Sequence, residues 1–567
     1  MHVKIRILSI FFIILFFAVT ARLFWWQVIK GKTLSNQAKN QYSVSTVTTA
    51  SRGSILASDG TPWVARMSAW NIWANPRLLS RSPLEIAKKM SPLLTENVDE
   101  DAVNEELRLK ALLEKDVNWV LLKQKVDEGI KNNIEAMDFK GIGYDPVEAS
   151  YYPEASVAAQ ILGFVGKDDD GKDIGYFGLE GYYNLPLSGK SGYLGGEKDA
   201  KGSPILIGGS KQISAVSGID LLTSIDKRVQ TIVEYELEKG IEKYQATGGS
   251  VTIMDPKNGK IMAMANFPAY DPSDYASYND SLFKNPVITD TFEPGSILKV
   301  VVMAAGIDAK VVEPDTPCDI CSGPLKLDKY FIKTWNDKYT PNISMTDVIV
   351  ESDNIGMSFV GQKLGAATLY DYLTKFGIGK KTGIDLQGEV APKLREKGTW
   401  SEVDLATASF GQGVAVTGIE MVRAVAVIAN GGYLVIPKVV NSIKGEGWEE
   451  KIETDNPVRI ISQETASKIT QMMVEATGRG EAKWCKTPGF SVAGKTGTAQ
   501  IPVEGHYDET NTIHSFIGFA SPKNAKFVML VTLRSPQASP WAAETAAPLW
   551  FAIAEDLFPY FGIAPEP

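Results

Sequence analysis

Three short strings, far apart in the chain, constrain the fold more than any other feature of the sequence. They are Ser296-Ile297-Leu298-Lys299, Ser352-Asp353-Asn354 and Lys495-Thr496-Gly497-Thr498, in that order. Each string alone is a weak signal, because a long chain matches such patterns by chance. Together and in this order they indicate attack of an activated serine on an acyl group, so the fold must bring three distant segments into one site.

The Ser-x-x-Lys pattern occurs three times, at residues 224–227, 281–284 and 296–299. Ser296 opens an apolar run over residues 300–305, which predicts that it lies in the first turn of a buried helix. There its hydroxyl would lie near the positive end of the helix, and Lys299 would share its face. Ser281 is followed by Asn-Pro, which disfavours a helix, and Ser224 suits a capping position. Ser296 is therefore the candidate nucleophile.

The Lys-Thr-Gly pattern occurs at Lys381 as well as at Lys495. Small and β-compatible residues surround Lys495 and predict a strand at a sheet edge, where the backbone of a ligand can pair closely. Lys381 lies in residues 377–383, which contain three glycines in seven positions and indicate a loop. Lys495 is therefore the candidate site lysine.

The polar string at residues 352–354 has a structural alternative, because Ser, Asp and Asn also favour turns and helix caps. A second Ser-x-Asn, at residues 277–279, precedes Ser296 and so breaks the order of the motifs. The position of Ser352 and Asn354 between the other two strings favours the functional interpretation. His514 lies in a strand-like apolar stretch, which is more typical of a structural than of a catalytic histidine.

Residues 7–28 predict a membrane-spanning helix. The first fifteen of them are apolar except for two hydroxyl side chains, and the apolar run continues past Arg22 through Trp25 and Trp26. About 20 apolar residues span a bilayer, and tryptophan favours the membrane–water interface. A cleaved signal peptide with a small-residue site at 19–21 is the alternative, but the apolar continuation favours a retained anchor. Basic residues on both sides leave the orientation open.

Composition excludes several classes of protein. The 567 residues allow two or more domains, and 44% hydrophobic with 22% charged residues are ordinary for globular domains. The net charge of -9 argues against binding to nucleic acid. The three cysteines show no ligand spacing with the histidines, so we expect no metal and no cofactor. Cys318 and Cys321 are either a small disulfide loop, if they lie outside the cytoplasm, or two free thiols.

The pattern of apolar residues predicts an α+β fold for the C-terminal part. A helix with amphipathic spacing begins at Asp226, and another is expected at residues 544–558. Strands are expected at residues 250–255, 260–265, 515–520 and 526–533. Strands at both ends with helices between them indicate an antiparallel sheet packed against a helical cluster.

With these motifs the chain resembles the class B penicillin-binding proteins, the cell-wall D,D-transpeptidases of bacteria. Further segments are similar to signatures of that family, at residues 51–60, 152–153, 162–166 and 178–180. Residues 292–296, 409–417 and 514–520 look more like its division and sporulation branch than its elongation branch.

The resemblance implies a domain order. We expect a cytoplasmic tail (1–6), a single transmembrane anchor (7–28), an elongated pedestal or dimerisation domain (45–210) and a penicillin-binding transpeptidase domain (226–563). It also implies that the folded domains lie outside the cytoplasmic membrane.

The resemblance further implies roles for the motif residues. Ser296 is the nucleophile and Lys299 its base, with a pKa that burial and the charge of Lys495 lower from the usual value of about 10.4. Ser352 and Lys495 pass the proton to the leaving amine. Asn354 holds Lys299 and the amide of the substrate. The backbone N–H groups of Ser296 and Thr498 form the oxyanion hole, and the hydroxyls of Thr496 and Thr498, flanking Gly497, bind the terminal carboxylate of the donor peptide.

The expected function is cross-linking of peptidoglycan stem peptides ending in D-Ala-D-Ala, during septal cell-wall synthesis, with covalent acylation by penicillin and other β-lactams. The family also implies a lipid II polymerase of the SEDS family and divisome proteins as partners. A D,D-carboxypeptidase or a serine β-lactamase shares the motifs, although no glutamate could be assigned as the base that the latter needs. A scaffold for the polymerase is the alternative of another class, but scaffolding does not require Ser296, Lys299 and Lys495 together.

Overall fold

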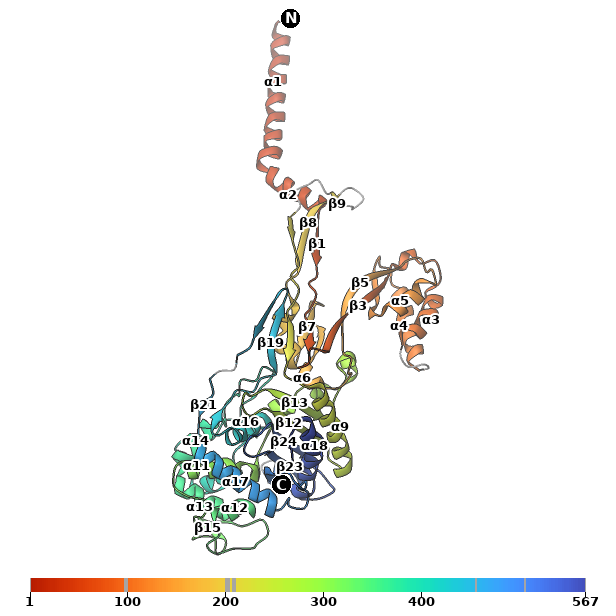
Figure 1. Ribbon diagram of the computed structural model, residues 1–567. Helices are drawn as coiled ribbons and strands as arrows, with labels where there is room; N and C mark the ends of the chain where they lie inside the picture. The colour runs from red at the N-terminus through yellow and green to blue at the C-terminus, as the bar shows by residue number, and fades with distance from the viewer. Residues whose placement is uncertain are drawn as a thin grey trace. The chain divides into compact units, whose positions relative to one another are not determined.

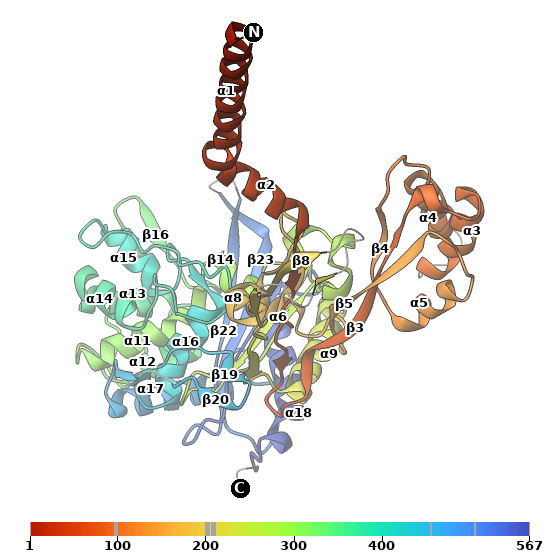
Figure 2. The ribbon, with the colours of Figure 1, turned by 90° about the horizontal axis from the view of Figure 1, so that it is seen from above.

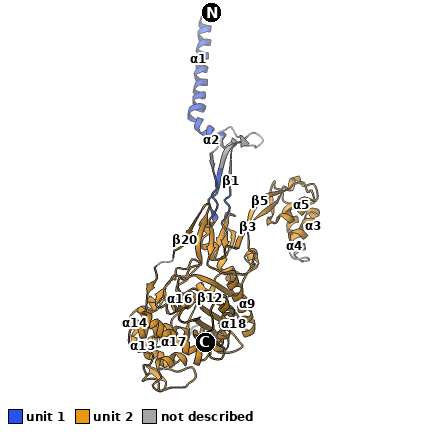
Figure 3. Cartoon of the chain, in the orientation of Figure 1, with its two compact units in different colours: residues 1–52, 188–218 blue, residues 53–187, 219–567 orange. Residues whose placement is uncertain are grey.

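The computed structural model describes residues 2–95, 100–198, 204–205, 211–453, 456–503 and 506–565. The chain divides into two compact units (Figure 3). The first unit comprises residues 1–52 and 188–218, and the second comprises residues 53–187 and 219–567.

The first unit contains the N-terminal helix and a small antiparallel sheet. Helix α1 (His2–Phe24) continues through a π-helical turn (Trp25–Ile29) into α2 (Gly31–Tyr42). The stretch from His2 to Ile29 is 28 residues long, apolar enough to cross a membrane and without buried residues. At 1.5 Å per residue it is roughly 40 Å long, which exceeds the ~30 Å hydrocarbon core of a bilayer. In the sheet, β8 (Gly192–Lys198) pairs with β1 (Ser43–Thr48), β9 (Pro204–Ile205) and β10 (Lys211–Ile213).

The second unit is built around a five-stranded antiparallel sheet with the order β13-β12-β24-β23-β22 (Figure 1). Its strands are β12 (Gly248–Met254), β13 (Ile261–Phe267), β22 (Val492–Val503), β23 (His506–Ala520) and β24 (Val528–Arg534). Strands β12, β13 and β24 overlap strands predicted from the sequence, and their ends differ from the prediction by at most two residues, whereas β23 begins at residue 506 rather than at 515. Strand β22, which carries Lys495, lies at the edge of the sheet as its small residues predicted.

Helices cover both faces of this sheet (Figure 2). Helices α9 (Lys227–Tyr244) and α18 (Ala546–Tyr560) pack on one face, in a core that includes Val233, Val531 and Trp550. The other face is covered by a helical cluster: α10 (Pro286–Thr289), α11 (Lys299–Asp308), α12 (Met345–Val350), α13 (Asn354–Leu364), α14 (Ala366–Lys375), α15 (Glu402–Ser409), α16 (Gly418–Ala429) and α17 (Gln463–Arg479). The predicted α+β class is confirmed.

Helix α11 is the centre of that cluster. Its residues from Lys299 to Ile307 are all buried, and a helix that is apolar all round is stable only inside a core. The apolar run that follows Ser296 in the sequence therefore anchors the candidate nucleophile to the buried core.

Residues 53–187 contribute to a second, seven-stranded sheet. Its strands are β2 (Ile55–Leu56), β3 (Pro62–Ala74), β4 (Val120–Val126), β5 (Ile142–Tyr151), β11 (Asp220–Thr223), β19 (Val440–Gly445) and β20 (Trp448–Lys451). Helices α3 (Pro83–Leu94), α4 (Glu100–Leu113) and α5 (Glu128–Glu135) close a core of their own against β3 and β4. A separate hairpin joins β6 (Phe164–Lys167) to β7 (Asp173–Tyr176).

Strands from both predicted folded domains share this sheet. Strand β11 pairs in parallel with β2 and antiparallel with β19, which comes from the C-terminal half of the chain. The buried carboxylate of Asp385 strengthens the junction, because it accepts hydrogen bonds from Val439 N (2.6 Å), Val440 N (2.9 Å) and the hydroxyl of Tyr183 (3.0 Å). The domain boundaries given above stay a prediction.

Candidate active site

The candidate nucleophile lies in a tight turn immediately before helix α11. Gly295–Leu298 forms a 3-10 turn, and Lys299 is the first residue of the α-helix. The sequence predicted the helix correctly but not the tightening of its first turn. Gly295 has φ +53°, and a Cβ at this position would lie 3.2 Å from the carbonyl oxygen of Thr498. Glycine therefore allows the turn to lie directly against strand β22.

The second motif brings its hydroxyl to the nucleophile. Ser352 Oγ donates a hydrogen bond to Ser296 Oγ at 2.9 Å. Next to it, Asp353 caps helix α13, because its Oδ1 accepts from Gly356 N at 2.8 Å. The capping interpretation is thus correct for Asp353, and the functional interpretation of Ser352 and Asn354 stays a prediction.

Lys299 is held by the second motif as well. Its Nζ donates to the backbone oxygen of Ser352 (2.6 Å) and to Asn354 Oδ1 (2.8 Å), and Ser352 Oγ lies 3.3 Å away. A neutral lysine amine has two N–H groups and one lone pair. The two carbonyl oxygens satisfy both N–H groups, so the lone pair is left for the hydroxyl of Ser352.

Burial sets the charge of Lys299. The side chain is fully buried. Burial, and secondly the charge of Lys495, lower its pKa to about 7, against the smaller opposing effects of Asp353 and Glu481. A large fraction of Lys299 is therefore neutral at neutral pH, as a general base requires.

The third motif lies along the edge strand β22. Lys495 Nζ donates to the backbone oxygen and to Oγ1 of Thr496, both at 3.2 Å. Burial lowers the pKa of Lys495 too, and Glu481 opposes that change. A Cβ at Gly497 would lie 2.9 Å from Ile297 Cγ2, so this glycine allows the strand to pack against the nucleophile turn. Thr498 Oγ1 accepts from Ala542 N at 3.1 Å.

The structure brings all predicted site residues together, with one difference in connectivity. Among the described residues, the hydrogen-bond partner of Ser296 Oγ is Ser352, and Lys299 is reached through it. The other copies of the motifs have structural roles. Ser224 donates to the carbonyl oxygen of Ile261, and the hydroxyl of Thr382, next to Lys381, donates to Glu389.

His514 is structural, as predicted. Its ring nitrogens are hydrogen-bonded to Thr512 Oγ1 (3.0 Å) and Thr545 Oγ1 (2.7 Å). Burial lowers its pKa to about 4, so the ring is neutral at physiological pH. Both of its nitrogens are engaged away from the motif residues.

One neighbour of the site, Glu481, was missed from the sequence. Its Oε2 accepts a hydrogen bond from Thr496 Oγ1 at 2.8 Å. It follows the end of α17 and belongs to no motif. Only the packing of α17 against β22 brings it to the site, so no local signal in the sequence could have identified it.

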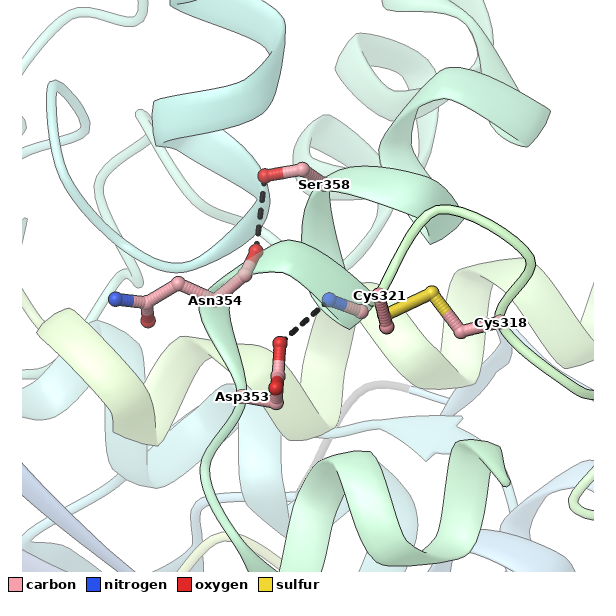
Figure 4. Close-up of a disulfide and its surroundings, with 6 residues drawn as sticks. Cys318, Cys321, Asp353, Asn354 and Ser358 are labelled. Atoms are coloured by element: carbon pink, nitrogen blue, oxygen red, sulfur yellow. Dashed lines mark hydrogen bonds between the residues drawn. A yellow bond between two sulfur atoms is a disulfide. The ribbon is translucent and has the colours of Figure 1, made fainter. Parts of the chain in front are cut away.

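Two further features lie beside the second motif. Cys318 and Cys321 form a disulfide next to the start of α13 (Figure 4), which decides the alternative that the sequence left open. The ring of Trp335 contacts that of Trp541 at a centroid distance of 5.2 Å.

Within the described ranges, no three His, Cys, Asp or Glu side chains lie close enough to hold a metal ion.

Comparison with known proteins gives matches over nearly the whole chain. Residues 249–556 match the model of the penicillin binding protein transpeptidase domain, and residues 47–223 that of the penicillin-binding protein dimerisation domain. Stage V sporulation protein D of Bacillus subtilis is 31% identical over 568 residues, covering 99% of this chain and 86% of that protein. Penicillin-binding protein PbpB of Mycobacterium tuberculosis is 29% identical over 570 residues, covering 96% and 82%.

Solved structures share the fold. The crystal structure of penicillin binding protein 3 from Mycobacterium tuberculosis, complexed with aztreonam, has a TM-score of 0.71 and 24% identity, and it covers 92% of this chain and 98% of that one. A peptidoglycan synthetase from Bifidobacterium adolescentis has a TM-score of 0.73 at 24% identity, covering 93% and 98%.

The two Lys-Thr-Gly copies give a first prediction. Lys495→Ala should abolish labelling by a fluorescent penicillin, because it removes the cation of the edge strand, whereas Lys381→Ala should label like the unaltered chain. Gel fluorescence at matched protein concentration measures both. If Lys495→Ala were fully labelled and Lys381→Ala lost its labelling, the assignment of Lys495 to the active site would be refuted.

The lowered pKa of Lys299 gives a second prediction. Because only the neutral amine accepts a proton, the second-order acylation rate should be half-maximal near pH 7 and should fall about tenfold for each pH unit below that. Stopped-flow acylation between about pH 5.5 and about pH 8.5 measures this dependence. A rate that does not change across this range would contradict the role of Lys299.

Proposed function

This chain belongs to the class B penicillin-binding proteins, and from that membership we propose that Ser296 is the nucleophile of a peptidoglycan D,D-transpeptidase. Relatives named peptidoglycan D,D-transpeptidases match 93% to 98% of the chain at 28% identity. The enzyme therefore acts in cell-wall synthesis. One observation carries the assignment of roles, namely the hydrogen-bonded set of Ser296, Ser352 and the buried Lys299.

In the acylation step, neutral Lys299 takes the proton of Ser296 by way of the hydroxyl of Ser352. Both hydroxyl hydrogens can rotate, so Ser296 can donate to Ser352 while Ser352 donates to the lone pair of Lys299. Ser296 Oγ then bonds to the carbonyl carbon of the penultimate D-Ala. The backbone N–H groups of Ser296 and Thr498 stabilise the oxyanion, a contribution typically worth about a hundredfold in rate for each donor.

Collapse of the tetrahedral intermediate breaks the C–N bond and releases the terminal D-Ala. Its nitrogen leaves as an amine after taking up a proton, which the set of Lys299, Ser352 and Lys495 supplies. The amine of a second stem peptide then attacks the ester, returns a proton to the same set and frees Ser296.

The edge strand and Asn354 bind the donor peptide. The free edge of the end strand β22 pairs with an extended peptide. Lys495 and Thr498 bind its terminal carboxylate, and Thr496 accepts from Lys495 and so holds this lysine in place. Asn354 Nδ2 donates one N–H to the carbonyl oxygen of Lys333 at 3.0 Å, which leaves its second N–H for an amide of the substrate.

The N-terminal helix fits a single-pass membrane anchor, and we propose that the residues after about 30 lie outside the cytoplasmic membrane. The Cys318–Cys321 disulfide supports this orientation, because disulfides persist in oxidising compartments. A lipid II polymerase of the SEDS family and divisome proteins are the proposed partners. Family membership supports them, together with an apolar helix α1 that has no buried residues and is free to pack on another membrane protein.

A third prediction concerns this topology. Mass spectrometry of the membrane-extracted protein should find an intact residue 7–28 segment, and protease added to intact spheroplasts should remove the residues after about 30. The physical reason is the apolar continuation past Arg22, which suits an anchor better than a cleaved signal. A mature N-terminus at Arg22, or full protection from external protease, would contradict it.

A fourth prediction is that a β-lactam forms a long-lived ester on Ser296. The leaving amine of the opened ring stays tethered and blocks the acceptor position, so deacylation is slow. Ser296→Ala should lose all labelling. Lys299→Ala should slow labelling by roughly a hundredfold or more, as expected on loss of a positioned base.

Peptide mapping of the adduct and its lifetime after dilution measure this prediction. Rapid, repeated turnover of penicillin would identify a β-lactamase, and labelling that survives Ser296→Ala would show that another serine is the nucleophile. Release of D-Ala from a pentapeptide without cross-linking, even with an amine acceptor, would identify a D,D-carboxypeptidase.

A further inference from the structure

The hydroxyl of Thr496 connects Glu481 to Lys495, the candidate site lysine on the edge strand β22. Glu481 Oε2 accepts from Thr496 Oγ1 at 2.8 Å, and Thr496 Oγ1 in turn accepts from Lys495 Nζ at 3.2 Å. Lys495 is thus connected to a carboxylate through a single hydroxyl. An opposite charge this close favours the protonated form of a buried lysine.

The hydrogen-bond partners of Lys299 are of a different kind. They are the carbonyl oxygen of Ser352, Asn354 Oδ1 and the Ser352 hydroxyl, all of them neutral. Asp353 acts on Lys299 through space, but its Oδ1 accepts from Gly356 N at the first turn of α13. The two lysines therefore differ in one respect, because only Lys495 has a hydrogen-bonded path to an acid.

We propose that Glu481 is a positioning residue that keeps the positive charge of the site on Lys495 and so leaves Lys299 neutral. Two buried like charges disfavour each other, so a cation fixed on Lys495 opposes a second one on Lys299. This effect of Lys495 on the pKa of Lys299 is larger than the direct, opposite effect of Glu481. This inference rests on the proposed function, because it assigns the proton that the reaction needs to one of its two lysines.

The same contacts fix how the carboxylate of a donor peptide binds. A protonated Lys495 has three N–H groups, of which two are directed to Thr496, so one is left for the ligand. Thr496 donates its own hydrogen to Glu481, whereas Thr498 Oγ1 accepts from Ala542 N and keeps its hydrogen to donate. The geometry thus favours Lys495 and Thr498 as the donors to that carboxylate.

Other charged groups near strand β22 are engaged elsewhere. Arg479 at the end of α17 pairs with Glu475 (2.7 Å) and Asp347 (3.0 Å). His514 on β23 is neutral at physiological pH because burial lowers its pKa to about 4. Glu544, in the 3-10 turn Ala542–Glu544, accepts from Ser539 at 2.5 Å. The groups that face Lys495 are therefore Lys299 and Glu481, with Asp353 beyond Lys299.

The test is the pH profile of acylation in Glu481→Gln, made in the full chain in detergent. Without the carboxylate the pKa of Lys495 falls, so its charge is lost at lower pH. In the unaltered chain the second-order acylation rate for a fluorescent penicillin should fall at high pH as Lys495 loses its charge, which gives the alkaline limb of the pH profile. In Glu481→Gln this fall should begin about one pH unit lower. At a given alkaline pH this is a roughly tenfold loss relative to the unaltered chain, whereas near pH 7 the rate should stay within about threefold.

Matched variants separate this role from a structural one. Glu475→Gln makes the same chemical change on α17, where the carboxylate pairs with Arg479 instead, and should keep the unaltered profile. Glu481→Asp keeps the charge and should restore part of the alkaline limb. Glu481→Ala should show the same shift of the alkaline limb as Glu481→Gln. It serves as the test variant if thermal unfolding shows that Glu481→Gln does not fold.

A uniform loss of rate at every pH, or an alkaline limb that does not move in folded Glu481→Gln or Glu481→Ala, would overturn the role of Glu481 while leaving the nucleophile intact. Failure of the proposed function looks different. In that case the unaltered chain and Glu475→Gln would not be labelled at any pH, and the role of Glu481 would be overturned with it.

Discussion

The burial of Lys299 is the constraint on which the rest of the site depends. A buried ammonium costs several kcal/mol unless it is paired with a counter-ion. Lys299 is fully buried, and its hydrogen-bond partners are a backbone oxygen, an amide oxygen and a hydroxyl. Burial, and secondly the charge of Lys495, therefore lower the pKa of Lys299 to about 7. An ordinary lysine becomes a base at neutral pH because the fold withholds water and a counter-ion.

Keeping this amine dry requires three segments to close around it. Helix α11 supplies the lysine from the middle of the core. The start of α13 supplies Asn354 and the turn before it supplies Ser352; the Asp353 cap holds this segment, and the disulfide lies beside it (Figure 4). The edge strand β22 closes the third side, and it approaches closely because position 497 lacks a side chain. Each segment is positioned by interactions that are independent of the reaction.

The sequence predicted what short-range chemistry determines. The apolar run after Ser296 and the small residues around Lys495 were sufficient for α11 and the edge strand, and the residues of the three ordered motifs lie together in the structure. Contacts between distant segments were not predictable. The link from Ser296 to Lys299 runs through Ser352, Glu481 reaches Thr496 only from the end of α17, and β19 pairs with β11 more than 200 residues earlier. No local pattern encodes such pairings, because they depend on how whole elements pack.

The two buried lysines also show why this residue type is suited to both positions. An arginine stays protonated in any protein environment, so it could not act as a base at position 299. A histidine side chain is shorter than that of lysine, whose Nζ here contacts Asn354 Oδ1 at 2.8 Å. Lysine combines reach with a pKa that burial lowers by several units. The surroundings of each amine, rather than its chemistry, then decide which of the two carries the charge.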